Sequence, residues 1–173
     1  MAEHNHVVLQ GTTQCSIWRG ALVYLLLGTF VGVQFVLQGS VSLMVPELKT
    51  DIGLDEVEIG LIASLFFYPY VLLQIPSARL VSKLGVRVVM ILSSAVIFTG
   101  CVIQAGANSA LVMALGRLMA GIGAAPIMVC FLGTIERFFV ASLFGVLAAG
   151  VEMFAMVGAS LGDFLIPDCI DRY

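Results

Sequence analysis

Apolar residues come in long, nearly unbroken runs along this chain of 173 residues. A helix that crosses a hydrocarbon core of about 30 Å needs about 20 mostly apolar residues, because lipid offers its backbone no hydrogen-bond partner. Five runs reach that length, and short polar or charged links separate them. The predicted spans are roughly Gly20–Val45, Ile59–Leu80, Val86–Gly106, Ala110–Gly133 and Phe139–Ile166. The pattern therefore predicts an all-α fold, a polytopic transmembrane bundle of five helices.

Composition supports the same class. Hydrophobic residues make up 60% of the chain and charged residues only 11%, whereas soluble domains carry about 25% charged residues. A water-soluble surface cannot be built from that supply, so membrane lipid is the expected surrounding. Residues 1–18 are predicted to be a polar tail and residues 19–173 a single transmembrane domain. The tail lacks the basic start and short apolar core of a cleavable signal, so the first run is expected to remain as a span.

Basic residues predict the orientation. If the spans alternate in direction, one side of the membrane receives Arg19, Arg79, Lys83, Arg87 and Arg137. The other side receives Lys49 and Arg172 among many acidic residues. Loops rich in Lys and Arg stay in the cytoplasm, so the N-terminal tail is expected to be cytoplasmic.

The link between the second and third runs carries a recognisable motif. It reads A-R-L-V-S-K-L-G-V-R over residues 78–87, which resembles the G-x-L-x-D-R/K-x-G-R/K-R/K signature of the major facilitator superfamily. The positions that fit are Leu80, Lys83, Gly85 and Arg87. Gly85 suits a turn that needs a positive φ angle. In the family the acidic residue of this gating loop helps to latch two halves of the transporter together, and here Ser82 takes its place.

Two further stretches strengthen the resemblance. The fourth run contains Arg117 followed by Gly121 and Gly123, which resembles the family's second signature. In the fifth run, Gly158 and Gly162 occupy positions similar to a glycine-rich signature, without its Gly-Pro pair. The resemblance extends from about Arg19 to the end of the chain. It implies secondary active transport of a small solute by alternating access, as proton symport, in a membrane such as the bacterial inner membrane.

The family fold has two halves of six helices each, and five spans are less than one half. We therefore expect the chain to be a truncated frame or fragment that lacks C-terminal helices and is inactive alone. One alternative stays open, namely a small membrane scaffold or assembly protein with no transport activity.

Charged residues inside the predicted spans are the first candidates for a solute or ion cavity. Arg117 and Glu152 lie at similar depths, roughly 10 Å from the external face at 1.5 Å per residue. An unpaired charge there would cost at least about 2.5 kcal/mol, so we expect the two to face a central cavity and interact. Proton coupling or anion binding is the functional interpretation; a permanent ion pair that orients two helices is the structural one. Arg117 favours an anionic solute.

Gln34 and Gln38 add polar side chains to the first run, one helical turn apart. They are further cavity candidates, and hydrogen bonding between helices without any ligand is the alternative. Small residues four apart let helices approach closely. The predicted helix-packing glycines are Gly28, Gly32, Gly121, Gly123, Gly158 and Gly162. They are expected to pack within this domain, or in part against the missing half.

Other chemistries find no support in the sequence. Residues 158–162 also spell G-x-S-x-G, but the histidines, His4 and His6, lie in the polar tail and cannot serve as base for a serine at depth. The sequence shows no phosphate loop, no basic nucleic-acid surface and no metal-ligand spacing among its cysteines. We expect no enzyme activity, no cofactor, no metal and no nucleic-acid partner; the expected partners are lipid and a small-molecule solute.

Overall fold

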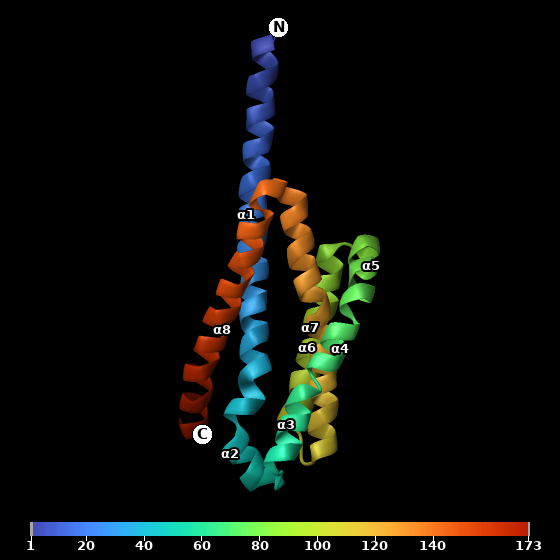
Figure 1. Cartoon of the computed structure of the whole chain (residues 1–173), viewed down its shortest axis with the longest axis vertical. Coiled ribbons are helices and arrows are strands. Elements are labelled where there is room, and N and C mark those ends of the chain that lie inside the picture. The colour runs from blue at the N-terminus through green and yellow to red at the C-terminus, as the bar shows by residue number, and fades with distance from the viewer. Residues whose placement is uncertain (1, 173) are drawn as a thin grey trace.

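The structure is a computed structural model that describes the backbone of residues 2–172 and the side chains of residues 18–50 and 52–167. Long helices run side by side, and the chain passes up and down between the two ends of the bundle (Figure 1). The elements are α1 (Ala2–Leu43), α2 (Val45–Glu47), η1 (Leu48–Ile52), α3 (Glu56–Ser64), α4 (Phe67–Leu72), α5 (Gln74–Leu84), α6 (Val86–Ala105), α7 (Ala110–Phe138), η2 (Ala141–Leu143) and α8 (Phe144–Arg172). No strand occurs within residues 2–172, which confirms the all-α prediction. His4 and His6 lie outside the described side chains.

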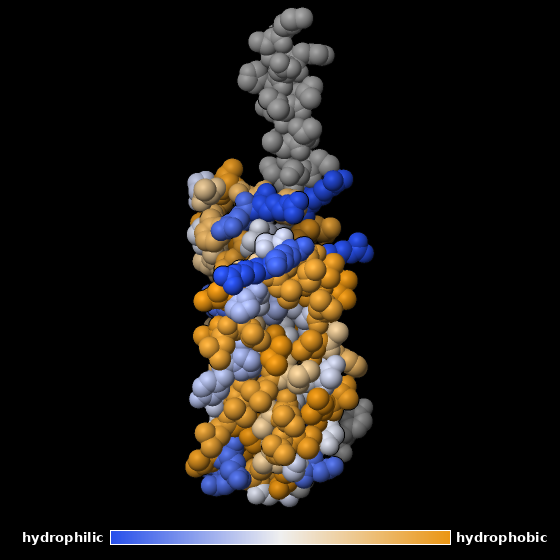
Figure 2. Space-filling model, turned by 90° about the vertical axis from the view of Figure 1, so that its right-hand side faces the viewer, coloured by the Kyte–Doolittle hydropathy of each residue, from blue (hydrophilic) through white to orange (hydrophobic). Residues whose placement is uncertain are grey.

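Within that part of the chain, 4 helical segments are long and apolar enough to cross a membrane, or 5 when one bent pair is taken as a single span. The straight segments are Trp18–Leu43, Val86–Ala105, Ala110–Phe138 and Ala141–Pro167. Large apolar side chains cover the outside of the bundle, and hydrophilic residues gather toward its two ends (Figure 2). Such a surface is stable in lipid and not in water, so the chain is an integral membrane protein.

The second span differs from its prediction. The sequence predicts one helix over Ile59–Leu80, but the structure breaks it into α3, α4 and α5, with a bend of 52° between Leu72 and Gln74. Pro69 and Pro76 explain the breaks, since proline has no N–H to give to the carbonyl four residues earlier. The carbonyls of Leu65 and Leu72 lose that partner, and the helix is interrupted at residues 65–66 and at Leu73.

A capping box starts α3 at the opposite end of the bundle from the α5–α6 turn. The Asp55 side chain accepts a hydrogen bond from the backbone N–H of Glu58, and the backbone N–H of Asp55 donates to Glu58 Oε2 at 3.0 Å. The two reciprocal bonds satisfy N–H groups that a helix start would otherwise leave free. The cap therefore fixes where the loop ends and the second span begins.

Loss of this cap is expected to loosen the start of the second span. Asp55→Ala should lower the free energy of unfolding by about 0.5–2 kcal/mol, because a capping acceptor is removed. Asp55→Ser keeps a hydrogen-bond acceptor at this position and should retain most of the stabilisation that the cap contributes. Hydrogen exchange of the α3 amides in detergent micelles measures the effect directly. Equal exchange in the Ala and Ser variants would show that the cap contributes nothing.

Helix α7 is the centre of the bundle. It packs against α1, α4, α5 and α6, and it contributes the largest share of buried side chains. Helix α1 lies between α7 and α8 and makes its most extensive contact with α8. Close approach depends on small residues: a Cβ on Gly100 of α6 would lie 2.8 Å from the backbone nitrogen of Ala120. The packing brings the polar residues of α1, α4 and α7 to one level of the bundle.

Candidate functional site

Arg117 is held by the backbone of α1. The residue is only 2% exposed; its Nη1 donates to the carbonyl of Leu37 at 2.8 Å, and its Nη2 donates to the carbonyl of Gln38. The guanidinium carbon lies 5.5 Å from the centre of the Phe66 ring. A buried cation needs hydrogen bonds or a π face to offset its lost hydration. Two carbonyl dipoles and one aromatic ring provide this support, and they leave the full positive charge in place.

One donor of Arg117 remains unused. Its Nε is buried and has no hydrogen-bond partner in the structure. Such orphaned donors are rare in folded proteins, and strain, a functional role, or a bound water or ion can explain one. Arg117 borders a cavity of about 220 Å³ between α1, α6 and α7, whose polar lining also includes Ser40, Cys101 and Gln104. The cavity offers room for an acceptor close to a fixed positive charge.

The expected interaction between Arg117 and Glu152 is absent. Among the described side chains the only ion pair joins Lys49 and Glu56, at 2.5 Å. Glu152 is exposed on α8, and α1 lies between much of α8 and α7. Equal depth along two helix axes does not determine how each helix is rotated, and this is why the pairing was wrong.

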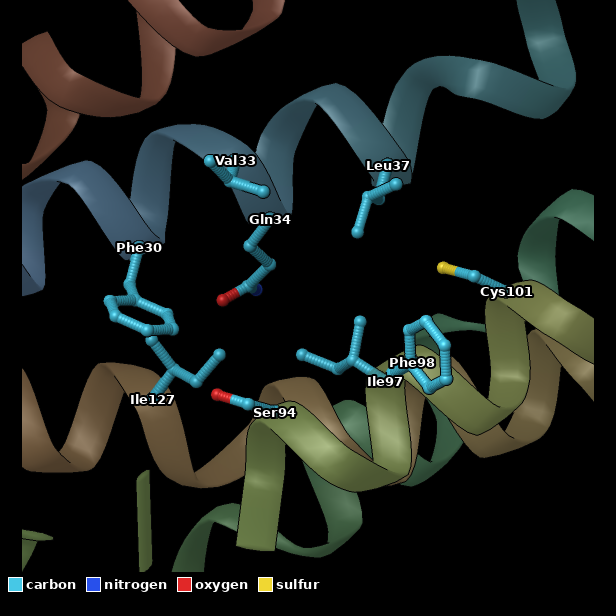
Figure 3. Close-up of a pocket in the computed structure, with 9 residues that line it drawn as sticks. All are labelled: Phe30, Val33, Gln34, Leu37, Ser94, Ile97, Phe98, Cys101 and Ile127. Atoms are coloured by element: carbon cyan, nitrogen blue, oxygen red, sulfur yellow. The ribbon is translucent and has the colours of Figure 1, made fainter. Parts of the chain in front are cut away.

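A second polar group surrounds Tyr70 of α4. The Tyr70 hydroxyl interacts with the side-chain amides of Gln74 and Gln34, and Glu152 lies within electrostatic range of it. Gln34 is 4% exposed, and its amide points from α1 into a cavity of about 230 Å³ bordered by α6 and α7 (Figure 3). Arg117 lies next to this group through Phe66, whose ring it faces and whose ring also stacks on Tyr70, with the two ring centroids 5.8 Å apart. We call Arg117, Gln34, Tyr70 and Gln74 the polar site.

The other predicted residues lie as follows. Gln38 is half-buried and contributes its carbonyl to Arg117 rather than its side chain. The gating-loop residues Leu80, Ser82, Lys83, Gly85 and Arg87 are exposed at the α5–α6 turn, where the Ser82 hydroxyl donates to the carbonyl of Arg79 at 2.8 Å. Gly85 has a φ of 80°, the positive value that its place in the motif predicts. These residues are remote from the polar site along the second span.

The six glycines lie at close helix contacts. Gly32 faces Gly158, and a Cβ on Gly28 would lie 2.6 Å from the Phe154 ring. Gly162 lies against Val36, so three of the contacts join α1 to α8. On α7, a Cβ at Gly121 would meet the carbonyl of Phe66, and one at Gly123 would lie 2.7 Å from Ile97. In this structure all of these contacts are within the domain.

Sequence reasoning missed three residues beside the polar site, namely Phe66, Cys101 and Gln104. Phe66 and Cys101 carried no signal beyond being apolar residues in a span. Gln104 was one polar residue near the end of a run. Tyr70 and Gln74 are polar residues within the second predicted run, and the bend of that span explains how they reach Gln34.

The structure is a bundle of apolar helices with a buried arginine and a buried glutamine amide in its interior. Residues 20–168 match the family model of the Major Facilitator Superfamily, so the chain belongs to this family. The chain is similar to the "Probable sulfoacetate transporter SauU" of Cupriavidus necator, with 29% identity over 91 residues, which are 53% of this chain and 21% of that protein. It is also similar to the "Probable anion transporter 6" of Oryza sativa subsp. japonica, with 35% identity over 72 residues, 41% of this chain and 17% of that protein. The matched segments thus span about a fifth of the length of these relatives.

Proposed function

We propose that this chain forms the substrate-binding part of a secondary active transporter that moves a small organic anion by alternating access, coupled to protons. The observation that carries the proposal is the buried guanidinium of Arg117, whose Nε has no hydrogen-bond partner and whose charge is not paired with a carboxylate among the described side chains. A fixed cation at this depth is unfavourable unless an anionic solute or an aqueous cavity compensates it.

The geometry suits a small anion. Carboxylates and sulfonates accept hydrogen bonds from the planar edge of a guanidinium, and the free Nε offers one such donor. The amides of Gln34 and Gln74 and the Tyr70 hydroxyl can bind the polar remainder of the solute. Cavities of about 220 and 230 Å³ fit a solute of a few heavy atoms. The two relatives named above, for sulfoacetate and for anions, agree with this substrate class.

Orientation is part of the proposal. Arg79, Lys83 and Arg87 lie at or near the α5–α6 turn, at the same end of the bundle as the α7–α8 link with Arg137. Basic residues collect on the cytoplasmic side of a membrane. We propose that this end lies on the cytoplasmic side of a bacterial inner membrane. The capping box of α3 then lies on the external side.

The proposal is tested by binding and uptake of isotope-labelled sulfoacetate in proteoliposomes that contain the complete transporter of which this chain is the proposed part. Uptake that saturates and accumulates the anion when the outside is made acidic is the expected result. Proteoliposomes that neither bind nor take up sulfoacetate, acetate or a chemically similar small anion would contradict it. That outcome would favour a scaffold without transport activity.

Glu152 is the proposed proton-coupling residue. Its exposed side chain on α8 lies within electrostatic range of Tyr70, so its charge acts on the polar site. Glu152→Gln is expected to abolish the dependence of uptake on a pH gradient while leaving anion binding intact. Asp163→Asn is the matched control, because Asp163 is an exposed acid on a similar face of α8. An unchanged pH dependence in Glu152→Gln would exclude this role.

A further inference from the structure

Cys101 joins the two cavities of the polar site. Its side chain borders the cavity that contains Gln34 (Figure 3), and it also borders the cavity that contains Arg117. It is partly exposed, whereas Cys130 of α7 has no exposed surface. The thiol of Cys101 and the guanidinium of Arg117 also lie within electrostatic range of one another.

A cysteine alone does not make a site, but this one has a second feature beside it. Arg117 is only 2% exposed and borders the same cavity. Its Nε has no hydrogen-bond partner. A negatively charged molecule within this 220 Å³ cavity would lie beside both the charge of Arg117 and the thiol of Cys101. An anion that carries a thiol-reactive sulfur is the chemistry that fits both groups.

We propose that Cys101 is a covalent modification site for small thiol-reactive anions, which Arg117 binds through their negative group. The proposal rests on the anion site of the proposed function. In the reaction the Cys101 thiol loses its proton to solvent, and the resulting thiolate attacks the sulfenyl sulfur of a thiosulfonate or disulfide. A new S–S bond forms, and the sulfinate or thiolate of the reagent leaves with the electron pair of the broken bond. The adduct occupies the space between the Gln34 and Arg117 cavities, so anion binding is blocked.

The probe is 2-sulfonatoethyl methanethiosulfonate, which transfers a sulfonate-bearing thiol and releases methanesulfinate. Its cationic counterpart, 2-(trimethylammonio)ethyl methanethiosulfonate, is the charge control. The protein is reconstituted in lipid, and peptide mass spectrometry measures the labelling rate of Cys101, with Cys130 as internal control. Each rate is divided by the rate of that reagent with free cysteine, which removes intrinsic differences in reactivity.

The anionic reagent is expected to label Cys101 at least about tenfold faster than the cationic one, because a positive site concentrates anions. Cys130 should react slowly with both. Arg117→Gln should remove the charge preference, and Arg117→Lys should retain it. The Lys variant shows that the preference follows charge and not a loss of folding. Equal normalised rates for the two reagents, or labelling of Cys130 as fast as Cys101, would overturn the proposal.

Protection of Cys101 from labelling by a bound anion tests this proposal and the proposed function separately. Sulfoacetate in excess should slow labelling of Cys101 by the anionic reagent if it is a ligand of the site. Charge-selective labelling without such protection would support the modification site and contradict the substrate assignment. Absence of charge-selective labelling in a protein that transports sulfoacetate would contradict the modification site alone.

Discussion

Arg117→Gln is expected to weaken binding of a small organic anion by about 10- to 100-fold, because one charge-assisted hydrogen bond contributes roughly 1.5–3 kcal/mol. Glutamine keeps a polar side chain but removes the charge and the Nε donor. Arg117→Lys should show an intermediate loss, since it keeps the charge and loses the planar set of donors. Binding of labelled sulfoacetate to the lipid-reconstituted wild type, Arg117→Gln and Arg117→Lys proteins measures the three affinities.

Arg87→Gln is the control for this prediction. Arg87 is an exposed basic residue at the start of α6, distant in sequence from the polar site, and its loss should leave anion affinity unchanged. If Arg87→Gln weakened binding as much as Arg117→Gln, the attraction would come from general positive charge. The assignment of Arg117 would then fail.

Gly158→Ala is expected to separate α1 from α8. A Cβ at Gly158 would fall on the carbonyl of Gly32, and backbone cannot move aside as a flexible side chain can. Overpacking of this kind costs typically about 1–3 kcal/mol, here with the additional loss of neighbouring contacts such as Gly28 with Phe154. Unfolding by SDS in mixed micelles, followed by loss of helix, measures the free energy.

Gly133→Ala provides the matched control. Gly133 also lies within a transmembrane helix, α7, but a Cβ there would meet nothing within 4 Å. Alanine favours a helix over glycine by about 1 kcal/mol, so this variant should be as stable as the wild type or slightly more stable. Equal stability of the Gly158 and Gly133 variants would mean that the α1–α8 contact is looser than the structure shows.

The sequence was sufficient to predict the spans because lipid imposes a length and a polarity that few other folds share. The start of α6 at Val86 and of α7 at Ala110 follow directly from the turn at Gly85 and the capping Ser109, whose side chain accepts from Val112 N–H. The break in the second span was harder to predict from the sequence. Prolines are tolerated in many transmembrane helices, so Pro69 and Pro76 did not reveal a bend of 52°.

The site was harder to predict than the fold. Hydropathy identified Arg117, Glu152 and Gln34 as polar residues within spans, but it could not tell which way each side chain points around its helix. Arg117 was therefore matched with a carboxylate at the same depth, and its partners proved to be backbone carbonyls of Leu37 and Gln38. Backbone groups carry no sequence signal, so no inspection of residue types would have found them.

The most direct test of an anion site at Arg117 is the NMR signal of its Nε–H group. The protein is labelled with ¹⁵N-arginine, embedded in lipid nanodiscs and titrated with sulfoacetate, and Arg117→Lys assigns the signal by its disappearance. A shift of the Arg117 signal that saturates with the anion, while the Arg19, Arg79 and Arg87 signals stay in place, is the predicted result. Saturable binding of sulfoacetate with an unmoved Arg117 Nε–H signal would contradict it.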